Sequence, residues 1–158
     1  MVSTGTEAIT AQINQDTGVV TFSTENTTPL GDYVAEISCG EAEPIEITLS
    51  VTAPAIESLR YSGTGNTIKM TAMNRTVNVT IIREPNFSQG GNMAYTLSGY
   101  DENFVIEKVE NNVYNGKYGY YYDKFTVKQI SATQATQYID ITFAIGDITL
   151  PLQIQPYR

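Results

Sequence analysis

The segment from Gln137 to Gln155 constrains the fold more than any other part of the chain. Its sequence, QYIDITFAIGDITLPLQIQ, holds two runs of alternating apolar and polar residues, separated by Gly146-Asp147. Such alternation predicts half-buried strands, and Gly-Asp suits a two-residue hairpin turn. In this register the apolar residues face one another in four pairs: Ile145 and Ile148, Phe143 and Leu150, Ile141 and Leu152, Ile139 and Ile154. A slip of one residue would expose the whole apolar row, so the register is well defined.

Pro151 provides a test of this hairpin. Counting from the turn places Pro151 opposite Thr142 at a non-hydrogen-bonded pair, where its missing N–H faces away from the partner strand. We therefore expect any third strand on that side to be absent, bulged or short there.

Similar segments with turn residues between them cover the rest of the chain. Before residue 54 they are residues 7–13, 19–23, 33–39 and 45–51, and after it they are residues 59–62, 68–72, 77–81, 93–97, 104–109 and 118–130. No window shows a convincing helical period. Strands at this spacing predict an all-β protein, built as a sandwich or a barrel.

The best candidate for a domain boundary is Thr52-Ala53-Pro54-Ala55. A strand pattern ends there, the proline restricts its preceding residue to extended geometry, and a new pattern begins near Leu59. We expect a β unit at residues 1–53 and a β-sandwich domain at residues 54–158.

A motif in the first unit resembles a known family. Residues 16–20 (DTGVV) followed by residues 29–37 (PLGDYVAEI) are similar to the pattern D-x-x-T-G-x-I … P-x-G-x-Y-x-x-x-V of bacterial cadherin-like or immunoglobulin-like domains. The resemblance covers residues 13–51. It implies one or more immunoglobulin-like antiparallel β-sandwiches of the kind found in tandem on secreted and surface proteins. In that family the motif normally lies in the second half of a domain, whereas little precedes it here, so residues 1–53 are either a partial domain or complete the sandwich formed by the rest.

Charge argues against two classes of partner. The chain has a net charge of −8 with only nine Lys and Arg. Nucleic acids and anionic membrane surfaces attract basic patches, so neither is expected to bind. No apolar run approaches the length of a membrane-spanning helix, and the start at Met1 shows no secretion signal.

The residues needed for common catalytic or metal sites are scarce. The chain has no His, the usual general base and metal ligand. The single Cys39 alternates in phase with Tyr33, Ala35 and Ile37, which predicts a small core residue and not a nucleophile. Acidic loops at residues 41–43 and 101–103 offer oxygen ligands for Ca²⁺, but such loops are usually only solvated. We expect no enzyme, no metal and no cofactor.

The most distinctive stretch is residues 114–128, YNGKYGYYYDKFTVK. In one continuous strand, Tyr118, Tyr120 and Tyr122 share an outward face with Lys124, and Phe125 and Val127 point inward. Adjacent tyrosines on an exposed face can stack on sugar rings or anchor a protein interface. The alternative is that they only stabilise the sheet, and a turn at residues 123–124 would change the phase. The predicted ligand-binding residues are Tyr118, Tyr120, Tyr122, Asp123 and Lys124.

These observations predict a non-catalytic extracellular β-sandwich module of a bacterial surface protein. Its expected partner is a glycan or another surface protein, bound through the tyrosine-bearing face. The alternative is a structural decoration or fibre protein of a virion. A small hydrolase is a third interpretation, disfavoured by the missing His and the absence of a catalytic motif.

Overall fold

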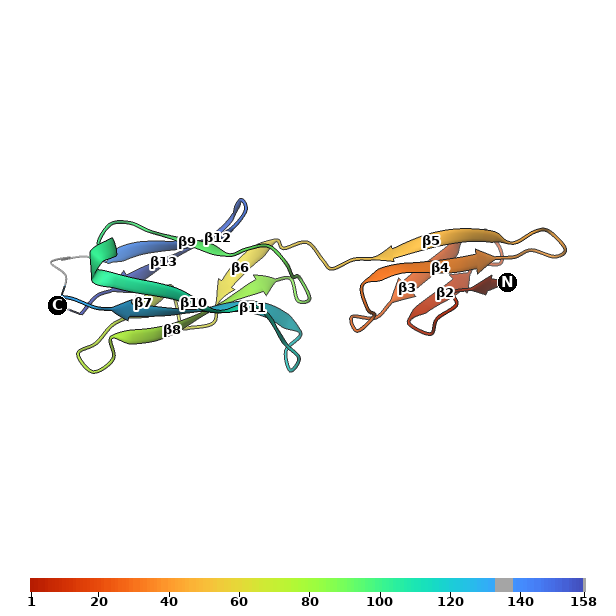
Figure 1. Ribbon diagram of the computed structural model, residues 1–158. Helices are drawn as coiled ribbons and strands as arrows, with labels where there is room; N and C mark the ends of the chain where they lie inside the picture. The colour runs from red at the N-terminus through yellow and green to blue at the C-terminus, as the bar shows by residue number, and fades with distance from the viewer. Residues whose placement is uncertain (133–137, 158) are drawn as a thin grey trace. The chain divides into compact units, whose positions relative to one another are not determined.

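The computed structural model describes residues 1–132 and 138–157 and divides the chain into two compact units, Met1–Ala53 and Pro54–Arg158 (Figure 1). Both units are built from strands, with one short 3₁₀ helix in the second. The strands of unit 1 are β1 (Val2–Ser3), β2 (Ile9–Ile13), β3 (Val20–Thr24), β4 (Gly31–Ile37) and β5 (Ile45–Val51). Unit 2 contains β6 (Ser58–Tyr61), β7 (Thr67–Lys69), β8 (Thr76–Glu84), β9 (Ala94–Leu97), η1 (Asp101–Asn103), β10 (Phe104–Asn115), β11 (Tyr120–Gln129), β12 (Ile139–Ile145) and β13 (Ile148–Gln155).

Unit 2 consists of two four-stranded sheets with a shared apolar core. One sheet has the strand order β10-β11-β8-β6 and the other has the order β7-β13-β12-β9 (Figure 1). Side chains from both sheets enter one core, and Phe125 of β11 meets Phe143 of β12 with 4.8 Å between ring centroids. Two sheets that bury their facing side chains in this way form a sandwich-like arrangement. The prediction of an all-β protein is therefore confirmed.

The hairpin predicted at the end of the chain is confirmed as β12 and β13. Its register pairs Ile139 with Ile154, Ile141 with Leu152, Phe143 with Leu150, and Ile145 with Ile148. Thr142 faces Pro151, and the neighbouring strand β7 pairs with β13 only at residues 153–155. The third strand is thus short and begins only beyond the proline, which agrees with the missing N–H.

Unit 1 holds two smaller sheets, one of β1, β4 and β5 and one of β2 and β3. The predicted pairs form, since β2 and β3 enclose the turn at residues 14–18 and β4 pairs with β5 along its whole length. One expectation is wrong, because Cys39 is exposed and not a core residue. The reason is that β4 ends at Ile37, so the alternation that made Cys39 an inward residue stops two positions earlier.

The described residues contain no helix that is long and apolar enough to cross a membrane.

Candidate functional site

Residues 120–128 of the tyrosine-rich stretch belong to a single strand, β11, without the turn at residues 123–124 that would have changed its phase. Tyr118 lies in the turn at residues 116–119 and not in this strand, so the prediction of one continuous strand is wrong at its start. Phe125 and Val127 are buried on the core side, as predicted. Tyr122 lies on the opposite side of the sheet, where it pairs with Val113 of β10 and Ile82 of β8. We call this outward surface around Tyr118, Tyr120 and Tyr122 the tyrosine face.

The three rings of the tyrosine face follow one another at close spacing. The centroids of Tyr118 and Tyr120 are 5.9 Å apart and their planes differ by 4°, so these rings are nearly parallel. Tyr122 lies 6.3 Å from Tyr120 at 76° and therefore presents its edge to the parallel pair. Tyr118 is 56% exposed, whereas Tyr120 and Tyr122 are half-buried. The surface thus consists of two parallel rings bounded by a third ring at a steep angle.

Polar groups fix the edges of this aromatic row. Asn115, at the end of β10, donates from Nδ2 to the Tyr120 hydroxyl at 3.3 Å, and its Oδ1 accepts from the Lys117 backbone N–H at 3.2 Å. The Lys117 ammonium lies 4.9 Å from the Tyr118 ring centroid, within the range of a cation–π contact. The turn between β10 and β11 therefore anchors both parallel rings.

Glu110 of β10 anchors the third ring. The Tyr122 hydroxyl donates to the Glu110 carboxylate, and Lys124 Nζ donates to Glu110 Oε1 at 3.1 Å. These hydrogen bonds, that of Tyr122 foremost, hold the pKa of Glu110 below its ordinary value. The same hydrogen bond, aided by desolvation and the negative charge of Glu110, raises the pKa of Tyr122. Lys124 does share the tyrosine face, but its ammonium is already paired.

The floor beneath Tyr122 is apolar. Ile82 faces outward on β8 yet is only 2% exposed, and it is the cross-strand neighbour of both Tyr122 and Arg60. Arg60 in turn forms an ion pair with Glu84, with 2.6 Å between Nε and Oε1. A buried isoleucine on the outward face means that the surrounding side chains form a packed layer on this part of the sheet.

Asp123 does not lie on the tyrosine face, contrary to the prediction. Its side chain points to the core side and is fully buried, with Oδ2 lying 2.6 Å from Nη2 of the equally buried Arg83. The alternation that turns Phe125 inward also turns Asp123 inward, so the sequence contained the signal for its orientation. The partners Arg83 and Glu110 were missed because they come from other strands, and only the sheet order brings them to β11.

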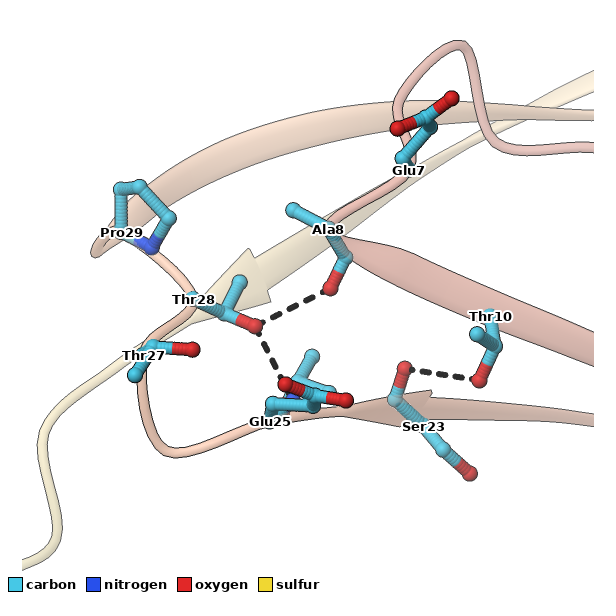
Figure 2. A pocket seen from close by; sticks show the side chains of 9 residues that line it. Glu7, Ala8, Thr10, Ser23, Glu25, Thr27, Thr28 and Pro29 are labelled. Atoms are coloured by element: carbon cyan, nitrogen blue, oxygen red, sulfur yellow. Dashed lines mark hydrogen bonds between the residues drawn. The ribbon is translucent and has the colours of Figure 1, made fainter.

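Unit 1 has a separate open hollow of about 300 Å³ between the end of β3 and the start of β2 (Figure 2). Two carboxylates and several hydroxyls line it, and its residues are Glu7, Ala8, Thr10, Ser23, Thr24, Glu25, Thr27, Thr28 and Pro29. Figure 2 shows that the Thr28 hydroxyl donates to the Ala8 carbonyl at 3.0 Å and accepts from the Glu25 N–H at 3.0 Å. The Thr10 hydroxyl also donates to a backbone carbonyl, that of Ser23. These hydroxyls already bond to backbone groups near the start of β2 and the end of β3, which makes the hollow a weaker candidate than the tyrosine face.

A second hollow, of about 150 Å³, lies on the outward surface of β10 and β11, beyond Lys124 from the tyrosines. Its lining combines apolar and charged side chains, namely Val105, Glu107, Thr126, Lys128 and Ile130. Val105 is 37% exposed and Ile130 is 51% exposed. The outward surface of this hairpin therefore carries accessible apolar groups near both ends.

Among the side chains of residues 1–100, 102–132 and 138–157, no group of three or more His, Cys, Asp or Glu is arranged to hold a metal ion. The acidic loop at residues 41–43 therefore belongs to no such group, and the side chain of Asp101, in the other acidic loop, lies outside the described residues.

No known protein-family model matches this chain, and no curated protein matches it significantly in sequence.

Proposed function

We propose that this chain is a non-catalytic, extracellular, carbohydrate-binding module of a bacterial surface protein, with an immunoglobulin-like β-sandwich fold. The observation that carries the proposal is the pair of parallel rings, Tyr118 in the turn between β10 and β11 and Tyr120 at the start of β11. Tyrosine rings offer a flat apolar face to the C–H groups of a sugar and a hydroxyl to its oxygens. The third ring, Tyr122, bounds this surface on one side.

The polar surroundings support the same ligand class. Amide, ammonium and carboxylate groups of Asn115, Lys117 and Glu110 lie at the edges of the rings, and such groups can hydrogen-bond to sugar hydroxyls. A mostly apolar surface with a few placed polar groups is typical of small-molecule recognition. The proposed binding residues are therefore Tyr118, Tyr120 and Tyr122, with Lys124 acting through Glu110.

Affinity electrophoresis in gels containing soluble polysaccharides, followed by a glycan array, tests this proposal. We expect retardation by at least one polysaccharide. We expect Tyr118→Ala and Tyr120→Ala each to weaken binding by about fivefold or more, as loss of a contact worth more than about 1 kcal/mol would do. Tyr138→Ala is the matched control, because Tyr138 is 51% exposed and lies outside the tyrosine face. Tyr120→Phe separates stacking, which it keeps, from hydrogen bonding. Absence of binding to any glycan, or equal binding by all variants, would contradict the proposal.

The alternative is a structural decoration or fibre protein of a virion, in which the same hairpin surface contacts another protein. The exposed apolar side chains of Val105 and Ile130 on this surface favour that alternative. Sedimentation equilibrium distinguishes the two, since a stable oligomer favours assembly and a monomer at high concentration favours glycan binding.

A further inference from the structure

Four residues of unit 2, two of them fully buried and two half-buried, form a closed ring of polar contacts. Arg83 Nη2 lies 2.6 Å from Asp123 Oδ2, and Asp123 Oδ1 accepts from the Asn112 backbone N–H at 3.0 Å. Asn112 Oδ1 accepts from the Gly90 N–H at 3.1 Å, and the Gly90 carbonyl accepts from Arg83 Nε at 3.2 Å. The ring therefore joins two strands, β8 and β11, to β10 and to the loop after β8.

The two charged members of the ring are completely inaccessible to solvent. Both side chains have 0% relative exposure. Removing two charges from water is costly, and a buried ion pair is often no more stabilising than apolar side chains of the same volume. The need to fill the core therefore does not explain why Arg83 and Asp123 are there. Their role follows from the two backbone groups that they bind, the Gly90 carbonyl and the Asn112 N–H.

One of these backbone groups lies in an irregular part of β10. Asn112 has a positive φ of 50°, and it falls where the register of β10 and β11 shifts between Glu110 and Val113. Such an irregularity re-aims the side chains around it. Glu110 is the residue just before this shift, and it holds Tyr122 and Lys124. By binding the Asn112 N–H, Asp123 fixes the segment that presents Glu110.

The other backbone group lies in the loop at residues 85–91. This loop holds the hairpin turn from the side, because the Phe87 N–H donates to the Gly119 carbonyl at 2.9 Å and Asn86 Nδ2 donates to the Tyr118 carbonyl at 3.2 Å. Gly119 has a φ of +71°, and a Cβ added there would lie 3.0 Å from the Phe87 ring. The hydrogen bond from Arg83 Nε to the Gly90 carbonyl thus fixes the loop that supports Tyr118, the first tyrosine of the tyrosine face.

We propose that Arg83 and Asp123 are positioning residues that hold Tyr118 and Tyr122 in place from inside the sandwich, one through the loop at residues 85–91 and the other through the irregular segment of β10. This inference rests on the proposed function for its biological meaning, but its structural content can be measured without a ligand.

The decisive variant is the double substitution Arg83→Met/Asp123→Leu, which replaces the pair with apolar side chains. We expect it to stay folded, with the β12–β13 register retained, while the Gly90 and Asn112 amides exchange with solvent about tenfold faster or more, as loss of a buried hydrogen bond predicts. In NMR spectra we expect the contacts between the Tyr118 and Tyr120 rings, and between the Tyr122 ring and Glu110, to weaken. Asp140→Leu/Gln153→Met is the matched control, because it removes an exposed side-chain hydrogen bond of the other sheet, between β12 and β13, and should leave these signals unchanged.

Asn112→Gly keeps the experiment informative if the double variant does not fold. Glycine tolerates the positive φ and removes only the side-chain acceptor of the Gly90 N–H, so faster exchange at Gly90 and Phe87 is expected. Unchanged exchange and unchanged ring contacts in Asn112→Gly, or in a folded double variant, would overturn the inference.

Polysaccharide binding then separates this inference from the proposed function. If the wild type binds a polysaccharide, a folded double variant should bind it about tenfold more weakly or worse, and equal binding would overturn the inference. If the wild type binds none, the proposed function fails, while the exchange rates and ring contacts still decide whether Arg83 and Asp123 position the tyrosines.

Discussion

The two units of this chain are both made of antiparallel strands, but they differ in how much they bury. Among the residues that the structure describes, unit 2 has fifteen buried hydrophobic residues, whereas unit 1 has only Ile9 and Ala35. Several large apolar side chains of unit 1 are exposed, among them Val34 at 55% and Ile45 at 65%. A domain of about 50 residues buries a smaller share of its surface on folding than a larger domain does, so unit 1 has little margin of stability.

Charge separates the units even more sharply. Residues 1–53 contain eight carboxylates and no Lys or Arg, whereas residues 54–158 contain nine of each sign. The whole net charge of −8 therefore belongs to unit 1. Glu36 and Glu46 even lie directly opposite each other on β4 and β5, an arrangement that destabilises a sheet. The comparison teaches that alternation alone forms strands in both units, while core size and charge balance decide how stable each one is.

The largest expected effect is on the isolated units. We expect residues 54–158 alone to unfold in one cooperative transition in urea, and residues 1–53 alone to show no folded baseline at low ionic strength, because of the small core and the unbalanced charge. Circular dichroism and two-dimensional NMR of each fragment provide the measurement. A cooperative transition of comparable midpoint in residues 1–53 would show that the comparison is wrong.

One substitution made in both units gives the next largest difference. Ile141→Ala in β12 should destabilise unit 2 by roughly 2–5 kcal/mol, since Ile141 has 0% exposure and its removal leaves a cavity. Ile45→Ala in β5 should change the free energy of unfolding of unit 1 by less than about 0.5 kcal/mol, because this side chain is largely in water. Urea titrations of the full chain followed by residue-resolved NMR measure both effects. Similar losses at the two sites would mean that Ile45 is better buried than the structure shows.

Local features of the fold could be predicted from the sequence, whereas contacts between strands distant in the chain could not. The register of the last hairpin followed from alternation and one turn, because every residue in that argument lies within nineteen positions of the others. The outward placement of Tyr120 and Tyr122 followed in the same way, whereas Tyr118 lies in the turn before β11, where strand alternation does not apply. Cys39 was misplaced because alternation does not say where a strand ends.

Asp123 shows the limit of this kind of reasoning. Its inward orientation was readable from its phase with Phe125, but a buried carboxylate is implausible without a partner. That partner, Arg83, is forty positions earlier and meets β11 only because β8 is its neighbour in the sheet. The irregular register at Asn112 is likewise a property of two paired strands and cannot be read from one of them.

A smaller effect concerns the like-charged pair of unit 1. Glu46→Gln should stabilise unit 1 by roughly 0.2–1 kcal/mol, because it removes repulsion with Glu36 across the strand pair. Glu43→Gln is the control, since it changes the net charge by the same amount in the exposed turn between β4 and β5. The difference between the two variants should shrink as salt is added, because screening weakens the repulsion. Equal stabilities of the two variants at low salt would indicate that only the overall charge matters.

The smallest expected effect concerns the pH dependence of the Tyr122–Glu110 pair. Lys124 also bonds to Glu110, and unit 1 contains no Lys that could form a similar cluster. The raised pKa of Tyr122 means that its hydrogen bond stabilises the fold below the ordinary value of 10.0 and is lost as pH rises through the raised pKa. The lowered pKa of Glu110 means the reverse, a contribution present above 4.5 and lost as pH falls through the lowered value.

Carbon-detected NMR titrations of the full chain measure both ionisations. Glu110→Gln should bring the pKa of Tyr122 down toward its ordinary value, and Tyr122→Phe should bring that of Glu110 up, because each variant removes the main partner of the other residue. Glu107→Gln serves as the control, since it removes a carboxylate of the same strand that faces Thr126 and not Tyr122. If Glu107→Gln moved the Tyr122 titration as far as Glu110→Gln does, general charge and not the hydrogen bond would set this pKa, and the anchoring of the third ring by Glu110 would be wrong.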